Sequence, residues 1–282
     1  MTYFGFLLRF LVIPIAIMLV VHLVLYWRGR RLPDSLRGMP AIPTLIAHIL
    51  VALIYTTPWD NYLVATGVWY YNPELVTGIV IGWVPIEEYT FFILQPILTG
   101  LWLFFMAMVL DLGSSANFER PRLRRWSVIL VGLVWVGSVI LLLSNWAPAT
   151  YLSITLAWAL PPIMLQLAVG ADILWRYRKL VFWSLVPMTL YLVFADSLAI
   201  GDGTWTIDPG QSFDVFINIF GNLLPIEEFV FFLMTNILLV FGLTLVLAKE
   251  SQLRLYDELI PWAKNLRRRG ELGIQTKETS IE

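Results

Sequence analysis

The sequence predicts an all-α, polytopic membrane protein of seven transmembrane helices, built from two parallel three-helix repeats and one connecting helix. Three observations predict this class. Hydrophobic residues make up 59% of the chain and charged residues 14%, with a mean hydropathy of +0.75, whereas a soluble domain carries about 25% charged residues. Seven apolar segments are each long enough to cross a bilayer core, which needs about 20 helical residues. Several polar and aromatic residues of the first half recur in the second half at constant spacing.

The apolar segments follow one another with short polar connections. The first segment is too long for the apolar region of a secretory signal and lacks a small-residue cleavage site, so we expect it to be retained as a span. The third and seventh segments are much longer than a bilayer core requires, and a proline interrupts each of them. We therefore expect a kink there, or a short outer helix followed by a new helix that begins at the proline. The predicted spans are 3–27, 40–58, 75–110, 126–146, 149–174, 180–200 and 213–248.

Basic residues occur in alternate connections. They follow the first, third and fifth spans and recur in the C-terminal tail, whereas the connections after the second, fourth and sixth spans contain none. The positive-inside rule therefore predicts a cell-membrane protein with an external N-terminus and a cytoplasmic C-terminus. The net charge of −1 and the lack of a basic surface outside the connections give no reason to expect a nucleic-acid partner. The chain has no cysteine, which excludes disulfides, thiolate metal sites and a cysteine nucleophile.

The two halves of the chain match each other residue by residue at several places. Because the matching segments start four spans apart, the two units should share one orientation and face each other across one interface, where ligand sites usually lie. We expect a first repeat in residues 1–110, a connector with the fourth span in 111–148, a second repeat in 149–248 and a tail in 249–282. The matching pairs include Tyr55 with Tyr191, Asp60 with Asp196, Trp69 with Trp205, Pro14 with Pro162, and Trp27 with Trp175.

Two copies of one tetrapeptide carry the most unusual residues of the chain. Pro85-Ile86-Glu87-Glu88 lies in the third apolar segment and Pro225-Ile226-Glu227-Glu228 in the seventh, and aromatic residues follow each copy. A purely structural interpretation exists, because Pro followed by Glu is a common helix start and the acid favours the positive end of the helix dipole. However, an ionised acid inside a bilayer costs about 2.5–3.5 kcal/mol, and a cap returns about 1 kcal/mol. Capping alone therefore does not explain two acids in each copy.

The spacing of the glutamates suggests a division of roles. Adjacent residues on a helix point about 100° apart, so one glutamate of each pair can face a cavity between the repeats while the other braces the backbone or a neighbouring span. Carboxyls that meet in a desolvated site do not readily ionise together, which leaves one as a proton donor and another as an acceptor. These are the elements of general acid–base catalysis. The candidate catalytic residues, without an assignment of acid and base, are Glu87, Glu88, Glu227 and Glu228.

Other polar and aromatic residues surround the two motifs. Asp60 and Asp196 are expected at the external ends of the second and sixth spans, where they could hydrogen-bond the glutamates or the indoles of Trp69 and Trp205; a helix end that meets water explains them equally well. Aromatic faces attract cations, which would serve a carbocation, although packing explains any single Phe better. Lone histidines on different spans give no reason to expect a metal site. The supporting candidates are Asp60, Asp196, Tyr55 and Tyr191, and the substrate-binding candidates are Trp83, Phe91, Phe92, Gln95, Asn222, Phe231 and Phe232.

At these residues the chain resembles a known family. A repeated Pro-x-Glu-Glu with following aromatics, an Asp before a Trp-containing external loop, and three spans per unit are similar to the small membrane lycopene cyclases, in which two homologous subunits or two fused halves form the enzyme. The chain resembles the fused form over residues 1–248, most specifically in GWVPIEEYTFFILQ and NLLPIEEFVFFLMTN. The resemblance implies a lycopene beta-cyclase, an isomerase that closes the linear ψ end groups of lycopene into β-rings by proton-initiated, redox-neutral chemistry without a cofactor. The resemblance also implies that the four glutamates provide the acid and the base of the reaction and that the two aspartates support them.

The same residues are compatible with other functions. A cyclase for longer, fifty-carbon carotenoids, or one that leaves ε or γ rings, would need the same acids, because cavity shape and base placement decide the product. A proton-coupled transporter could use buried acids as a relay, although the parallel repeats and the lack of a polar stripe through the inner leaflet argue against it. A retinal photoreceptor would need a lysine inside the membrane, and every Lys is predicted to be cytoplasmic. The expected partners are a linear carotenoid and the lipid bilayer, and the oligomeric state stays open.

Overall fold

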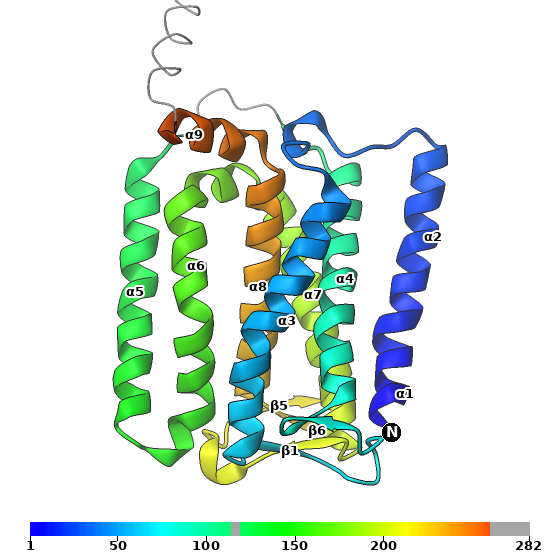
Figure 1. Ribbon diagram of the computed structural model, residues 1–282, viewed down its shortest axis with the longest axis vertical. Coiled ribbons are helices and arrows are strands. Elements are labelled where there is room, and N and C mark those ends of the chain that lie inside the picture. Colours follow the sequence, from blue (N-terminus) through cyan, green and yellow to red (C-terminus); the bar gives the residue numbers. More distant parts are fainter. Residues whose placement is uncertain (114–118, 260–282) are drawn as a thin grey trace, which may run out of the picture.

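The computed structural model describes residues 1–113 and 119–259, and seven of its helices are long and apolar enough to span a membrane. This confirms the predicted all-α polytopic membrane protein. Figure 1 shows the helices standing side by side, with the N-terminus and the strands at one end of the bundle and α9 at the other. The predicted tail lies outside the described residues from 260 onward.

The spans lie close to their predicted positions, except that the third and seventh begin later than predicted and the second ends later. The first one is continuous over Tyr3–Trp27 and contains a wide π-helical turn just before Pro14, whose ring crowds the preceding turn of the helix. The fifth span, α6, changes direction at Gly170, where φ is −157° and ψ is 35°. The helices are α1 (Tyr3–Leu7), the π turn (Leu8–Val12), α2 (Ile13–Trp27), α3 (Ala41–Ala65), α4 (Ile86–Val109), α5 (Pro121–Leu143), α6 (Thr150–Arg176), α7 (Arg178–Gly201), α8 (Ile226–Leu247) and α9 (Lys249–Leu259), with short 3-10 turns at Asp34–Leu36, Ala147–Ala149 and Pro209–Gln211.

The outer parts of the third and seventh apolar segments form β-hairpins, which corrects the expectation of a kinked span or an outer helix. Phe220 and Gly221, the turn of the second hairpin, have φ angles of 50° and 95°; two-residue hairpins favour such angles and helices do not. Apolar residues at the hairpin turns raised the hydropathy of these segments, yet Trp83 is 65% and Phe220 91% exposed. The hairpins are β2 (Val80–Ile81) with β3 (Val84–Pro85), and β5 (Phe216–Ile219) with β6 (Asn222–Pro225).

The prolines of the repeated motif mark the beginnings of two new helices, as their position predicts. Pro85 and Pro225 have extended backbone with ψ angles of 151° and 139°, and α4 and α8 begin at the next residue. A proline at this position costs the helix nothing, because the first N–H groups of a helix have no partner within it. The two glutamates of each motif therefore occupy the first turn of a buried helix.

The second span extends farther toward the hairpin end than predicted, whereas the sixth ends where predicted. α3 continues through Pro58 to Ala65, and α7 ends at Gly201. A proline removes one hydrogen bond and does not have to end a helix when neighbouring helices support the chain. Asp60 consequently lies inside its helix, as Asp196 does in α7, and both are buried, 0% and 1% exposed, and do not stand at water-facing helix ends.

A short antiparallel sheet joins the segments that follow α3 and α7. β1 (Trp69–Tyr71) pairs with β4 (Trp205–Ile207), with Trp69 opposite Ile207 and Tyr71 opposite Trp205. The register is symmetric, because each of the matching tryptophans lies opposite the third residue of the other strand. The sheet places Trp69, Tyr71 and Trp205 over the end of the bundle at which α4 and α8 begin.

Buried hydrogen bonds between side chains connect α4, α7 and α8 in the middle of the bundle. Asn236 on α8 accepts from the Gln95 amide and the Thr99 hydroxyl of α4, both at 3.0 Å, and donates to Thr189 of α7 at 3.2 Å. Such bonds contribute on average about 0.6 kcal/mol each in a membrane. They fix α4 and α8, and with them the glutamates, relative to each other.

At the other end of the bundle an ion pair fastens α9 to α6. The Arg254 guanidinium donates two hydrogen bonds of 3.0 Å to the Asp172 carboxylate, which is 1% exposed. Two parallel bonds of this kind are stronger and more directional than a single contact. The described part of the C-terminal segment is therefore held far from the glutamates.

Candidate functional site

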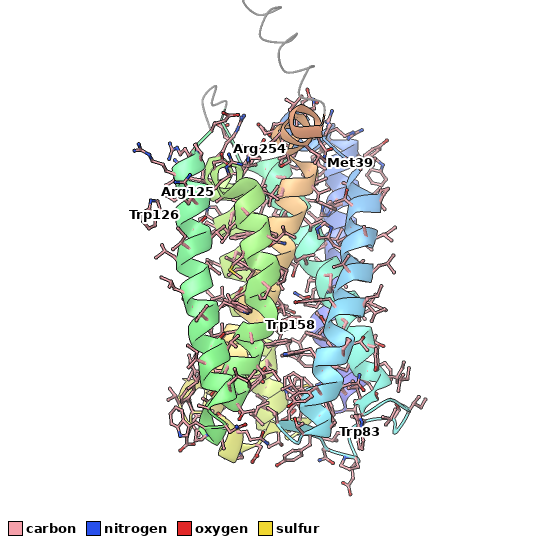
Figure 2. The ribbon with its side chains drawn as sticks, turned by 60° about the vertical axis from the view of Figure 1, so that its left-hand side comes forward. Met39, Trp83, Arg125, Trp126, Trp158 and Arg254 are labelled. Atoms are coloured by element: carbon pink, nitrogen blue, oxygen red, sulfur yellow. The ribbon has the colours of Figure 1, made fainter. Side chains whose placement is uncertain are left out.

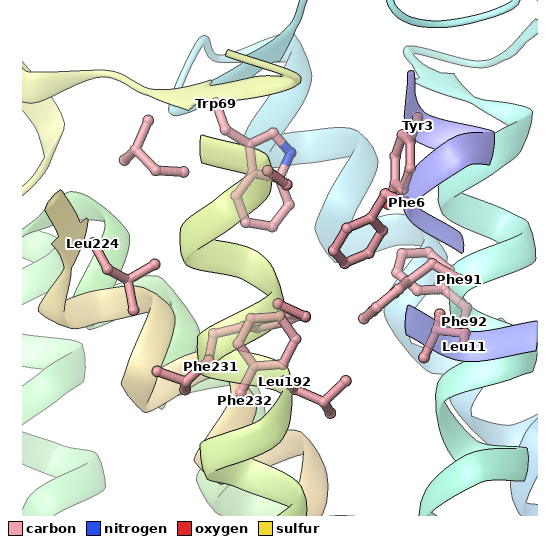
Figure 3. Packing of buried hydrophobic residues seen from close by; sticks show 14 of the residues in the cluster. Tyr3, Phe6, Leu11, Trp69, Phe91, Phe92, Leu192, Leu224, Phe231 and Phe232 are labelled. Atoms are coloured by element: carbon pink, nitrogen blue, oxygen red, sulfur yellow. The ribbon is translucent and has the colours of Figure 1, made fainter. Parts of the chain in front are cut away.

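Glu88 and Glu228 line one cavity beneath the β1–β4 sheet. This cavity, the carboxyl chamber, is narrow, with a volume of about 30 Å³, and its wall is mostly aromatic. Figure 3 shows the rings of Phe6, Phe91 and Phe231 gathered in this part of the bundle. Residues from both halves of the chain line the chamber: Tyr3, Phe6, Trp69, Tyr71, Glu88, Phe91, Asp196, Trp205, Glu228, Phe231 and Phe232.

Two phenols hold the Glu88 carboxyl. The hydroxyls of Tyr3 and Tyr71 both donate to Glu88 Oε2, the latter at 3.1 Å. Removal from water, followed by the neighbouring Asp60 and Glu88 carboxyls, raises the pKa of the Tyr71 phenol well above its ordinary value. Tyr71 therefore keeps its proton at neutral pH and remains a hydrogen-bond donor to Glu88.

Glu228 occupies the matching position in the second half but has fewer donors. The Tyr151 hydroxyl donates to Glu228 Oε1 at 2.8 Å, and Tyr151 matches Tyr3 at the same spacing that relates Pro162 to Pro14. At the position that matches Tyr71, the second half has Ile207, which is buried and carries no donor. The two carboxyls are thus alike in place and different in hydrogen bonding.

The other glutamate of each pair faces the connecting backbone, which is the division that the helical spacing predicts. Glu87 Oε1 accepts from the Thr77 N–H at 2.7 Å, and Glu227 Oε1 accepts from the Phe213 N–H at 2.7 Å and from the Ser212 hydroxyl at 3.3 Å. Both glutamates are 0% exposed, and neither lines the carboxyl chamber. They hold the segments that lead into the two hairpins against the starts of α4 and α8.

The two aspartates lie beside the chamber in different surroundings. Asp196 lines the chamber, and its Oδ1 accepts from the Trp205 indole at 3.0 Å; this is one of the two bonds expected for it. Asp60 is 0% exposed and interacts with the Trp69 indole, but less closely than Asp196 interacts with Trp205, and within the described parts of the chain this contact lies outside hydrogen-bond geometry. The contact between aspartate and indole is therefore tighter in the second half of the chain, whereas the chamber glutamate has more hydrogen-bond donors in the first half.

Tyr55 and Tyr191 lie away from the glutamates and complete the backbone of two proline-containing helices. Pro14 and Pro162 have no N–H, so the carbonyls four residues earlier, those of Phe10 and Trp158, lose their helical donors. The Tyr191 hydroxyl donates to the Phe10 carbonyl at 3.0 Å, and the Tyr55 hydroxyl donates to the Trp158 carbonyl at 2.8 Å. Tyr55 thus satisfies a carbonyl that Pro162 leaves without its helical donor, and Tyr191 adds a donor to a carbonyl of the π-helical turn before Pro14.

The structure brings together some of the substrate-binding candidates and not others. Phe91, Phe231 and Phe232 line the chamber, and Phe92 and Gln95 line a neighbouring groove. Trp83 lies at a hairpin turn at the edge of the molecule (Figure 2) and does not line the chamber. Asn222 lies in β6, with its amide against Gly201, and does not line the chamber.

Sequence reasoning missed the three tyrosines that hold the chamber carboxyls. A signal for two of them was present, because Tyr3 and Tyr151 stand in the same register as Pro14 and Pro162. Tyr71 has no counterpart in the second half and carries no such signal. Within the described ranges, no three His, Asp or Glu side chains are grouped as metal ligands.

Comparisons with known proteins give consistent results. The chain is 43% identical over 199 residues to a lycopene beta-cyclase of Halobacterium salinarum, covering 70% of this chain and 79% of that protein. It is 37% identical over 203 residues to a bifunctional lycopene cyclase/phytoene synthase of Podospora anserina, and 36% identical over 199 residues to one of Aspergillus niger; both alignments cover 69% of this chain and 33% of the fungal protein. No family model matches the sequence, and no solved structure matches it.

Proposed function

The chain belongs to the membrane lycopene cyclase family, and from this premise we propose that it is a lycopene beta-cyclase whose chamber carboxyls, Glu228 and Glu88, transfer the protons of ring closure. One observation carries the proposal: a glutamate from each half of the chain lines the same small, aromatic-walled cavity. The apolar, aromatic wall is chemically suited to a hydrocarbon end group, and the two carboxyls supply a proton donor and a proton acceptor.

The chemistry requires one proton to enter and one to leave. A carboxylic acid protonates the terminal double bond of the ψ end group, which produces a tertiary cation. The double bond between carbons 5 and 6 attacks this cation and closes the ring. A carboxylate then removes the proton from carbon 6, and no electrons are exchanged. The rings of Phe91, Phe231 and Phe232 stand around the chamber, where aromatic faces stabilise a cation.

The hydrogen bonds favour Glu88 as the base and Glu228 as the acid. Two phenol donors stabilise an ionised carboxylate at Glu88, whereas Glu228 has one. Hydrogen bonds to a charged acceptor contribute about 1.5–3 kcal/mol, so one additional donor is sufficient to bias which of two similar carboxyls holds the proton. After each ring closure Glu88 holds the proton that Glu228 has lost, and a transfer between them restores the starting state.

We expect Tyr71→Phe to slow cyclisation about tenfold, which corresponds to one lost hydrogen bond of about 1.4 kcal/mol. The reason is that Glu88 loses one of the two donors that stabilise its ionised form. The effect should fall on kcat, with KM little changed, because the phenol acts on the base and not on substrate binding. Tyr70→Phe is the matched control, because Tyr70 is 53% exposed on the same strand. Steady-state assays in proteoliposomes measure both variants; an unchanged kcat for Tyr71→Phe would contradict the assignment.

The domain division and the membrane orientation are part of this proposal. Repeats in 1–110 and 149–248 are supported by the matching Tyr3–Glu88 and Tyr151–Glu228 bonds and by the symmetric register of β1 and β4. The alternation of basic residues along the sequence supports an orientation in which the end of the bundle that holds the chamber faces the outside of the cell. The chamber then lies in the outer half of the bilayer.

Expression of the full chain in lycopene-producing cells tests the function directly. Chromatography of the extracted carotenoids should show β-carotene, with γ-carotene as the monocyclic intermediate. A product with ε rings, or one made only from a fifty-carbon precursor, would replace the substrate or product part of the proposal. Unchanged lycopene, with the protein folded in the membrane, would contradict a cyclase and favour the transporter alternative.

A further inference from the structure

A lateral groove lies between α3 and α6, next to the carboxyl chamber. This α3–α6 groove has a volume of about 320 Å³, and its walls come from α3, α4, α6 and α8. Its rim includes Val51 and Tyr55, which are 65% and 40% exposed on the flank of the bundle. Figure 2 shows Trp158 projecting from α6 into the space that faces α3. Phe91 and Phe231 line both the groove and the chamber, so the two cavities share a wall.

A continuous series of stacked rings runs from the rim of the groove to the chamber. Tyr55 stacks on Trp158 with 5.5 Å between the ring centroids, Trp158 stacks on Trp59 at 4.6 Å, and Trp59 stacks on Phe231 at 5.5 Å with its plane only 6° away from parallel. These rings pack on one another and stiffen the wall of the groove, behind which Trp59 is buried. The aromatic residues that line the groove itself are Tyr55, Phe91, Phe92, Trp158 and Phe231, and apolar rings of this kind pack well against a conjugated chain. Phe91 and Phe231 also line the chamber with Glu88 and Glu228.

The matching pocket in the other half does not reach the chamber. It lies between α2, α4 and α7, with a similar volume of about 330 Å³, and Pro14 and Tyr191 stand in it where Pro162 and Tyr55 stand in the α3–α6 groove. None of the residues that line this pocket also lines the chamber. Ala195 occupies the position that matches Trp59, which interrupts the series of rings. The two flanks of the bundle are thus related in sequence and different in access.

We propose that the α3–α6 groove is the polyene-binding site and that both ends of lycopene reach the chamber through it in two successive binding events. The inference rests on the proposed function and extends it to the path of the substrate. α3 lines the groove over residues 47–56, which is about 14 Å at 1.5 Å per residue and shorter than an extended lycopene molecule. The remainder of the chain lies in the bilayer, and the second end enters only after the first has left. γ-carotene is therefore released between the two ring closures.

Bulky substitutions on the two flanks test the binding site. Ala52→Trp places a bulky ring inside the groove. Val51→Trp narrows the rim of the groove and should disturb folding less than Ala52→Trp does, because Val51 is exposed. Ile17→Trp is the matched control in the other pocket, at a position that is 57% exposed. We expect Ala52→Trp to reduce formation of both γ-carotene and β-carotene about 100-fold, the scale for a displaced substrate. Val51→Trp should reduce it severalfold, and Ile17→Trp should retain wild-type activity, each normalised to folded protein measured by size-exclusion chromatography.

Each outcome of this comparison decides the proposal. Wild-type activity of a folded Ala52→Trp protein would overturn it, and so would an equal loss in Ile17→Trp. If Ala52→Trp does not fold, wild-type activity of Val51→Trp overturns the proposal and a selective loss supports it. These results leave the proposed function intact, because that function fails only if the wild-type chain does not cyclise lycopene.

The course of the reaction tests the successive binding events. With lycopene in large excess over wild-type enzyme in proteoliposomes, free γ-carotene should rise well above the enzyme concentration before β-carotene appears. γ-carotene that never exceeds the enzyme concentration would show that both ends are cyclised without release, which would overturn this part of the proposal.

Discussion

Replacement of either chamber glutamate by glutamine should leave lycopene uncyclised. Glu228→Gln removes the proton donor and Glu88→Gln removes the acceptor, and positioned acids and bases contribute about 10²–10⁴-fold to such reactions. We expect the rate to fall by about that factor in each single variant. Glutamine has nearly the same shape and keeps an acceptor for the Tyr151 or Tyr3 hydroxyl, so the fold should persist.

Pigment extraction from lycopene-producing cells measures this effect. Cells with either variant should retain red lycopene, while the amount of folded membrane protein stays close to that of the wild type. β-carotene at wild-type levels from both variants would show that the chamber carboxyls do not carry the proton transfers.

The second large effect is expected on stability and not on chemistry. Glu227→Leu should destabilise the protein by about 1–3 kcal/mol, the cost of leaving a buried donor without an acceptor, because the Phe213 N–H and the Ser212 hydroxyl both lose Glu227. Glu87→Leu should have a smaller effect, since its donor comes from Thr77, which is exposed. Glu227→Gln is the matched control, because its side-chain carbonyl still accepts both bonds.

Thermal unfolding in detergent micelles measures the difference. Glu227→Leu should unfold several degrees below the wild type, whereas Glu227→Gln should unfold near the wild-type temperature and still produce β-carotene. A folded but inactive Glu227→Gln protein would mean that Glu227 takes part in the chemistry, and the division between bracing and chamber glutamates would then be wrong.

The sequence predicts the helices of this protein well because hydropathy and proline position act locally. The starts of α4 and α8 follow from Pro85 and Pro225, whose missing N–H groups suit a first helical turn. The hairpins before them could not be predicted in the same way. Trp83 and Phe220 are apolar, so they extend the hydropathy signal, although both are exposed outside the helices.

The sequence predicts the chamber only in part. The repeated motif identifies the glutamates, and helical spacing predicts that one of each pair faces a cavity. It does not say which one, because that depends on how α4 and α8 are rotated, and the buried bonds around Asn236 help to fix this rotation. Tyr71 contacts Glu88, and Trp158 contacts Trp59, because segments that are separated in the sequence pack together. A local sequence pattern does not predict such contacts.

The central claim is that a buried carboxyl gives a proton to the hydrocarbon, and a single turnover in D₂O tests it most directly. Enzyme in proteoliposomes is equilibrated in D₂O, mixed with less lycopene than enzyme, and stopped when γ-carotene has formed. Because the acid has exchanged its proton with the solvent before the substrate arrives, mass spectrometry should find one deuterium in each γ-carotene molecule. γ-carotene without deuterium would contradict the account.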